Sequence, residues 1–215
     1  MDNFLIEPIR QSEMEKVSSL LVNAFVTNPA YALVFRNKSN LKEGLQWLFT
    51  ASLVINNQKH PLTMTIKEKK SEDIIGTFTL IPPQSVENTI SIYTKIGIGG
   101  FISQFGLSTL IRMLKLDATN KNILKKSLDN SRHYYLSMVA IKEEHRGKGT
   151  GSMVLKKVIN DLVNSSPLCP TIGLTTQLPE NVVFYSRLGF TKLDEGYVTF
   201  RESKYYNYNM KYDLY

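Results

Sequence analysis

Apolar residues along the chain follow two kinds of spacing. In some segments they recur every three or four positions, as expected for a helix with one buried face. In shorter segments they are β-branched or follow one another almost without interruption, which is typical of strands. Helices are expected within 12–28, 32–57, 99–130, 152–166 and 180–190. Strands are expected within 4–10, 62–70, 73–83, 133–141, 171–176, 190–200 and 204–213.

Polar and turn-forming residues indicate where several of these elements begin or end. Ser12 and Glu15 have the spacing of a capping box at the start of the first helix. A short polar turn separates the second and third strands, which favours an antiparallel hairpin. Gly189 follows the last helix, where a glycine commonly adopts the left-handed conformation. We expect one or two helices within 32–57 and two helices within 84–131.

The order of the elements indicates the fold class. Strands and helices alternate in the second half of the chain, which predicts an α/β fold on a mixed sheet. Segment 133–141 is apolar almost throughout, as expected for a central strand covered on both faces. The 215 residues suffice for one substantial core, so we expect a single domain spanning 1–215. A helical insertion at about 84–131 is too long to be an ordinary connection.

The net charge of +7 and the pI near 9.3 raise the question of a polyanionic partner. Lysines and arginines are spread along the chain without a basic arm or an aromatic-interleaved patch, so we expect no nucleic acid to bind. A polyanion smaller than a nucleic acid fits this distribution of positive charge better. No apolar run reaches the length of a membrane span, and the first residues lack the pattern of a signal peptide. We therefore expect no membrane partner and a cytoplasmic location.

Cysteine and histidine usage limits the chemistry further. Cys169 is the single cysteine, so it forms no internal disulfide, and we expect it to be a small core residue. His60, His133 and His145 are scattered and have no helical ligand spacing. The sequence therefore predicts no metal site.

The stretch HRGKGTGSM, residues 145–153, lies between an expected strand and an expected helix. Glycines permit positive φ and close approach to the backbone, and a helix start presents free N–H groups to an anion. Phosphate binding is the first interpretation, and a flexible basic turn is the alternative. Gly147, Gly149 and Gly151 alternate, which fits neither the P-loop nor the dinucleotide-binding pattern.

The loop does match Arg146-x-x-Gly149-x-Gly151, and here the sequence resembles the GNAT superfamily of acetyl-CoA-dependent N-acetyltransferases, whose pyrophosphate loop has this spacing. A second segment, from Asn181 through Phe-Tyr185 to Gly189-Phe, is similar to that family's N-x-x-FY-x-x-x-GF segment. The resemblance is distinctive from about residue 132 to 191. It implies the GNAT-like acyl-CoA N-acyltransferase fold, with a mixed, mostly antiparallel central sheet flanked by helices.

The resemblance also implies a site. Tyr185 lies where the family places the tyrosine that protonates the leaving thiolate. The backbone of the central strand would hold the pantetheine arm, and the glycine loop would hold the pyrophosphate. Asn181 would contact the cofactor arm or cap the helix. The implied acetyl-CoA contacts are Val139, Ala140, Ile141, Arg146, Gly147, Lys148, Gly149, Thr150, Gly151 and Asn181. Acetyl-CoA is the acyl donor, and the implied acceptor is a primary amine of a small molecule or peptide.

The sequence departs from the family at the general base. Many relatives carry a glutamate near the position of Thr175, where this chain has no carboxylate on the strand. His133 and Ser137 share one face of the central strand and suggest a proton relay to water, although a structural role for His133 is the stronger interpretation. Cys169 is poorly placed to carry the acetyl group, which favours direct transfer in a ternary complex.

Two other functions stay open at this point. A noncatalytic acyl-CoA-binding protein would use the same glycine loop, and an O-acetyltransferase would use the same donor. The insertion at 84–131 is expected to form a helical cover over the acceptor side. The acceptor is not named by the sequence, and a homodimer is left open.

Overall fold

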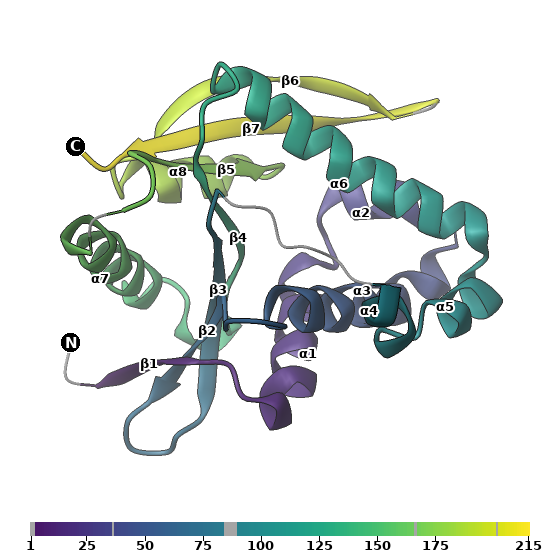
Figure 1. Ribbon diagram of the computed structural model, residues 1–215, viewed down its shortest axis with the longest axis horizontal. Helices are drawn as coiled ribbons and strands as arrows, with labels where there is room; N and C mark the ends of the chain where they lie inside the picture. Colours follow the sequence, from purple (N-terminus) through teal and green to yellow (C-terminus); the bar gives the residue numbers. More distant parts are fainter. Residues whose placement is uncertain (1–2, 36, 84–89, 166, 201) are drawn as a thin grey trace.

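The computed structural model describes residues 3–35, 37–83, 90–165, 167–200 and 202–215. Its centre is a seven-stranded sheet in the order β1-β2-β3-β4-β5-β7-β6 (Figure 1). The strands are β1 Phe4–Pro8, β2 Thr63–Glu68, β3 Ile74–Ile81, β4 Tyr134–Ile141, β5 Thr171–Thr176, β6 Thr191–Phe200 and β7 Ser203–Asp213. Strands β4 and β5 pair in parallel, and the other neighbouring pairs are antiparallel. This confirms the expected mixed, mostly antiparallel sheet.

Helices cover both faces of the sheet. They are α1 Met14–Phe25, α2 Pro29–Val34, α3 Leu41–Asn56, α4 Ile90–Lys95, α5 Ile98–Phe105, α6 Leu107–Ser127, α7 Thr150–Asn164 and α8 Pro179–Ser186. One core cluster joins one face of the sheet to α1, α2, α3, α5 and α6, and a second joins the other face to α7 and α8. Strand β4 contributes Ala140 to the first cluster and Leu136 to the second, which confirms its central, doubly covered position. Among the described residues, no helix is long and apolar enough to cross a membrane.

The order of strands and helices agrees with the sequence prediction, and the differences are local. The described part of the insertion, residues 90–131, forms three helices, α4 to α6, where two were expected. The predicted capping box is wrong. Ser12 lies inside a 3₁₀ turn at Gln11–Glu13, and the carboxylate that accepts a backbone N–H belongs to Glu13, bonded to Arg10 at 2.9 Å. The extra turn shifts the start of the helix past Ser12.

The insertion is part of the core. Phe101, Met113 and Leu116 are almost fully buried in the cluster formed with α1, α2 and α3. The buried Arg112 side chain in α6 donates from Nε to the carbonyl oxygen of Val34 at 2.7 Å. Removal of the whole segment would expose apolar surface, so its role over the sheet is better tested by point substitutions.

A nearly buried lysine joins the first two strands to the start of α1. The Lys67 ammonium lies 2.9 Å from Glu7 Oε2 and 2.6 Å from Glu13 Oε1, and its side chain is only 5% exposed. Burial by itself disfavours the charged forms of Lys67 and Glu13. The lysine nevertheless lowers the pKa of Glu13 below 4.5, and the two carboxylates raise the pKa of Lys67 above 10.5.

We predict that Lys67→Met lowers the free energy of unfolding by about 1.5 to 3 kcal/mol at neutral pH, the usual range for hydrogen bonds to charged groups. Glu13 contributes fully above pH 4.5, and its contribution is lost as the pH falls through the lower folded pKa. Lys67 contributes fully below pH 10.5, and its contribution is lost as the pH rises through the higher folded pKa.

Urea unfolding at several pH values measures the difference in the free energy of unfolding between the wild type and Lys67→Met. This difference should become smaller in acid. Lys192→Met, in the more exposed pair with Glu195, is the control. Equal effects of the two substitutions would contradict a role for burial.

Candidate functional site

Strand β4 carries a bulge at its middle. Ser137 pairs with Thr79 and Ala140 with Thr77, so Met138 and Val139 together lie opposite one residue of β3. Met138 has φ of 50°, in the left-handed region that a non-glycine residue seldom adopts. A bulge bends its strand and redirects the backbone groups around it. The second half of β4 is therefore turned relative to the first.

Strands β4 and β5 part shortly before this bulge. They pair only at Tyr134 with Ile172 and at Tyr135 with Gly173. Farther along, Ala140 and Ile141 still pair with β3, and no residue of the described chain pairs with their other edge. The backbone of the second half of β4 thus has one edge available for a ligand between the two strands.

The glycine loop lies between the end of β4 and α7. Gly147 and Gly149 have φ of 73° and 79°, and no atom lies within 4 Å of the position where either would carry a Cβ. Gly149 is the residue directly before α7, and Met153 is the first to bond back to its carbonyl oxygen, at 3.0 Å. The first N–H groups of α7 have no partner within the helix and carry its positive dipole end. The predicted loop therefore has the open backbone that an anion requires.

Charged side chains of the loop are exposed. Arg146 donates from Nε to the carbonyl oxygen of Ile141 at 2.8 Å, which fixes its stem to the end of β4. Lys148 is exposed, while Thr150 is buried at the start of α7. Two positive charges thus lie beside the helix start.

Tyr185 lies in α8, on the face of the sheet that α7 also covers. Its ring is buried against Phe184 and Phe190, with centroid distances of 5.1 and 5.5 Å. Its hydroxyl bonds to no residue that the structure describes. Burial raises the pKa of the phenol well above its usual value, and Tyr135 raises it further. The phenol therefore keeps its proton at neutral pH. Gly189 follows with φ of 98°, as predicted.

Asn181 is held at the end of β5. Its side-chain amide donates to the Thr176 hydroxyl at 2.9 Å, and the residue directly before α8 is Leu178. The alternative that Asn181 caps the helix is therefore wrong. Its contact with the cofactor arm stays a prediction.

Two side chains whose proximity the sequence did not indicate lie on the other face of the sheet, which α6 covers. Tyr135 of β4 and Thr175 of β5 both point to this face, and they interact beyond the last β4–β5 pair. Tyr135 also lies between His133 and Ser137 on its strand. His133 has its Nδ1 atom 3.0 Å from the carbonyl oxygen of Ser131, which fits the structural interpretation. No local pattern distinguished Tyr135 from the apolar residues around it.

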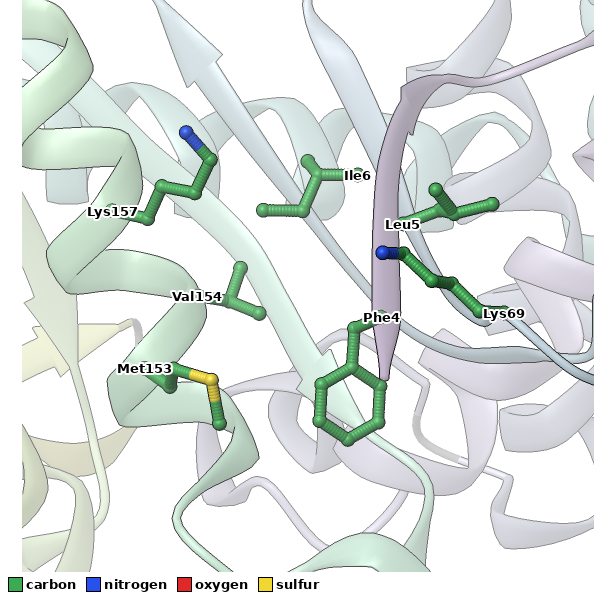
Figure 2. A pocket seen from close by; sticks show the side chains of 7 residues that line it. All are labelled: Phe4, Leu5, Ile6, Lys69, Met153, Val154 and Lys157. Atoms are coloured by element: carbon green, nitrogen blue, oxygen red, sulfur yellow. The ribbon is translucent and has the colours of Figure 1, made fainter. Parts of the chain in front are cut away.

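A cavity of about 310 Å³ lies elsewhere, between β1 and α7 (Figure 2). Its lining residues are Phe4, Leu5, Ile6, Lys69, Met153, Val154 and Lys157. Figure 2 shows Phe4 and Ile6 on the side of β1 that faces Met153, Val154 and Lys157 of α7, and Leu5 and Lys69 on the other side of the strand. None of the predicted site residues lines it, so the cavity does not belong to the predicted site.

Sequence comparison matches residues 115–192 to the family described as "Acetyltransferase (GNAT) domain". This segment contains β4, the glycine loop, α7, β5 and α8. No curated protein sequence matches the chain.

Solved structures share the fold at low sequence identity. A protein of Corynebacterium glutamicum, described as histone acetyltransferase HPA2 and related acetyltransferase, is 20% identical, with 97% of this chain and 95% of that chain covered and a TM-score of 0.59. Arylalkylamine N-acetyltransferase 2 of Aedes aegypti is 13% identical, with 99% and 100% covered and a TM-score of 0.60. Spermidine N-acetyltransferase of Vibrio cholerae, in complex with CoA and spermine, is 14% identical, with 100% and 97% covered and a TM-score of 0.54. Residues 115–192 therefore match a GNAT acetyltransferase domain, and nearly the whole chain shares its fold with solved structures described as acetyltransferases.

Proposed function

We propose that the protein transfers the acetyl group of acetyl-CoA to a primary amine, within a single domain spanning 1–215. The observation that carries this proposal is the separation of β4 from β5, with the N-terminus of α7 at its open end and the protonated Tyr185 beside it. Similar folds belong to enzymes named for arylalkylamine and spermidine N-acetylation, which favours nitrogen over oxygen as the acceptor atom.

Two parts of the site would bind the donor. The loop Arg146–Gly151 and the first N–H groups of α7 would hold the pyrophosphate, because they offer positive charge and open backbone. The edge of Val139, Ala140 and Ile141 that faces away from β3 would hydrogen-bond the pantetheine arm, apart from the Ile141 carbonyl oxygen, which accepts from Arg146 Nε. A backbone N–H of this edge would polarise the thioester carbonyl. Asn181 would contact the same arm.

Transfer requires three events. The neutral amine nitrogen forms a bond to the acetyl carbon, the carbon–sulfur bond breaks, and the thiolate receives a proton. Tyr185 would supply the last of these, regaining its proton from water, while the amine proton leaves to water. Because burial raises the pKa of Tyr185, full proton transfer is harder than from an ordinary phenol. A hydrogen bond that strengthens as charge develops on sulfur is the contribution we expect.

Free CoA release tests the proposal against its alternatives. We predict release from acetyl-CoA when primary amines are supplied and none above background with alcohols of the same carbon skeleton. Thiol detection across matched amine and alcohol pairs provides the measurement. Release with alcohols alone would replace the proposal with O-acetylation. Tight acetyl-CoA binding without release for any acceptor would indicate a noncatalytic binder.

A further inference from the structure

The cavity between β1 and α7 has no part in the proposed acetyl transfer, because none of the residues assigned to that reaction lines it. Its volume is about 310 Å³. Protein interiors leave few voids larger than a water molecule, and small-molecule sites begin at about 300 Å³. An apolar cavity of about 150 Å³ already holds a benzene ring. The space therefore has room for a ring with a short side chain, or for a branched chain of similar size.

Apolar side chains form the two walls of the cavity. Figure 2 shows Phe4 and Ile6 of β1 on the side of the strand that faces Met153 and Val154 of α7. Phe4 and Ile6 are only partly buried, although they pack against the core cluster that contains the almost fully buried Val154. Both therefore keep apolar surface that a ligand would remove from water, and such burial is the main favourable contribution to binding an apolar molecule.

The charged side chains of the lining are all positive. Lys69, directly after β2, and Lys157 of α7 are its two charged residues, and no acidic residue of the described chain lines the cavity. Lys69 is exposed, and its ammonium forms no hydrogen bond or ion pair with the residues that the structure describes. An anion is therefore favoured at the cavity over a cation.

The carboxylates closest in sequence to these lysines do not cancel both charges. Asp161 accepts from Lys157 Nζ at 2.7 Å, so the charge of Lys157 is partly offset. Glu68 precedes Lys69, but its Oε1 atom lies 3.8 Å from His145 Nδ1. Lys69 thus keeps a full positive charge for a ligand.

The free edge of β1 adds backbone donors. This strand is the last of the sheet on its side, so only one of its edges is paired. The backbones of Asn3 and Ile9 bond on the β2 side, at 2.9 and 3.0 Å. Backbone groups of successive residues alternate between the two edges of an antiparallel strand. The N–H groups of Phe4 and Ile6, which both line the cavity, therefore point to the free edge.

Three kinds of ligand can be compared at this cavity. A cation would be repelled by the lysines. A neutral apolar molecule would fill the volume and leave the positive charge and the free N–H groups without a partner. A carboxylate with an apolar body would use the walls, the ammonium and the backbone donors together, because hydrogen bonds to an ionised acceptor are stronger than those to a neutral one.

We propose that this cavity is a second ligand site, separate from the glycine loop, which binds a small carboxylate with an aromatic or branched aliphatic body. The body lies between Phe4, Ile6 and Met153, and the carboxylate lies at Lys69, the lysine without a partner among the described residues. The inference does not depend on the proposed acetyl transfer.

Calorimetry with the full wild-type chain compares phenylacetate, phenylacetamide and 2-phenylethylamine, which share one ring and differ in charge. Phenylacetate should bind with a Kd of about 1 mM or below. The amide should bind about three- to tenfold more weakly, and the amine more weakly still. Absence of phenylacetate binding, or equal affinities of the carboxylate and the amide, overturns the proposal. Saturating acetyl-CoA should leave the phenylacetate affinity unchanged, and displacement by acetyl-CoA would overturn the separation of the two sites.

Two substitutions test the position of the ligand. Met153→Trp, at a partly buried position, should fill the cavity and abolish phenylacetate binding. Lys69→Met should weaken binding about three- to tenfold. Lys70→Met is its matched control, because Lys70 is also exposed but does not line the cavity, and it should change the affinity by less than about twofold. Equal effects of the two lysine substitutions would contradict the placement of the carboxylate. Thermal melting of each variant reports whether it is folded.

NMR of the wild-type protein with ¹³C-labelled methionine methyl groups locates the ligand without relying on a filled cavity. The Met153 resonance is identified by its absence from Met153→Leu. It should shift when phenylacetate is added, whereas the resonance of Met14, in the core cluster on the other face of the sheet, should not. An unshifted Met153 resonance, or undiminished binding to a folded Met153→Trp protein, would place phenylacetate elsewhere and overturn the proposal.

Discussion

Replacing Tyr185 with phenylalanine is expected to lower turnover by roughly 10² to 10³-fold, the usual range for losing one hydrogen-bond donor to a charge that develops in the transition state, with acetyl-CoA affinity nearly unchanged. The substitution removes one oxygen and keeps the ring that packs between Phe184 and Phe190. Since the hydroxyl bonds to no described residue, its loss leaves no partner unsatisfied within the described chain. Single-turnover measurement of CoA release, with an acceptor found by screening, separates this step from binding.

Tyr212→Phe is the matched control for this prediction. Its ring contacts Phe190 at a centroid distance of 5.4 Å, so it belongs to the same aromatic cluster. Thermal melting should show both variants folded. If Tyr185→Phe and Tyr212→Phe both keep turnover within a few-fold of the wild type, Tyr185 has only a packing role and water is the proton source.

The donor half of the candidate site could be predicted from the sequence because its residues are close together along the chain. Only a short 3₁₀ turn, Glu143–His145, lies between β4 and Arg146, and Tyr185 is four residues after Asn181. Glycine spacing determines where φ can be positive, and the strand-loop-helix order determines where free N–H groups lie. Residues that are contiguous in sequence therefore determine most of the local geometry of this part of the site.

The acceptor half could not be predicted in this way. Tyr135 belongs to an apolar strand, and its importance depends on Thr175, which is distant in sequence and close only after β4 and β5 have paired and parted. The position of α6 depends on the bond between Asn120 and Tyr205, 85 residues apart. Helical spacing predicted that α6 exists but could not indicate which of its turns faces the sheet.

The bulge in β4 could not be predicted from the sequence either. An uninterrupted strand was expected from the apolar run, and the position of Met138 at positive φ has no signal in residue type, because methionine does not favour that conformation. The distortion follows from pairing with β3 on one side while β5 diverges on the other. Sheet pairing, and not local preference, therefore opens the edge on which the donor would lie.

Gly149→Glu is expected to weaken acetyl-CoA binding by well over tenfold, which corresponds to more than about 1.4 kcal/mol. The glycine directly precedes α7, and the space around its missing Cβ is open, so a glutamate there would place its carboxylate where the pyrophosphate is expected. Like charges at such short distance repel strongly in a partly desolvated site. Isothermal titration calorimetry measures the change directly.

Backbone strain must be separated from charge in this test, because Gly149 has φ of 79° and L-residues other than asparagine and aspartate seldom adopt that region. Gly149→Gln is therefore the control: it has the reach and the backbone strain of glutamate and lacks the charge. Melting temperatures of the two variants report any loss of folding. Equal weakening by glutamine and glutamate would assign the effect to strain or steric closure of the loop, whereas unchanged affinity in a folded Gly149→Glu protein would remove the loop from the binding site. A much larger loss with glutamate than with glutamine is the result that the positive end of α7 and the charges of Arg146 and Lys148 lead us to expect, since all three favour an anion at this position and a fixed carboxylate would occupy it.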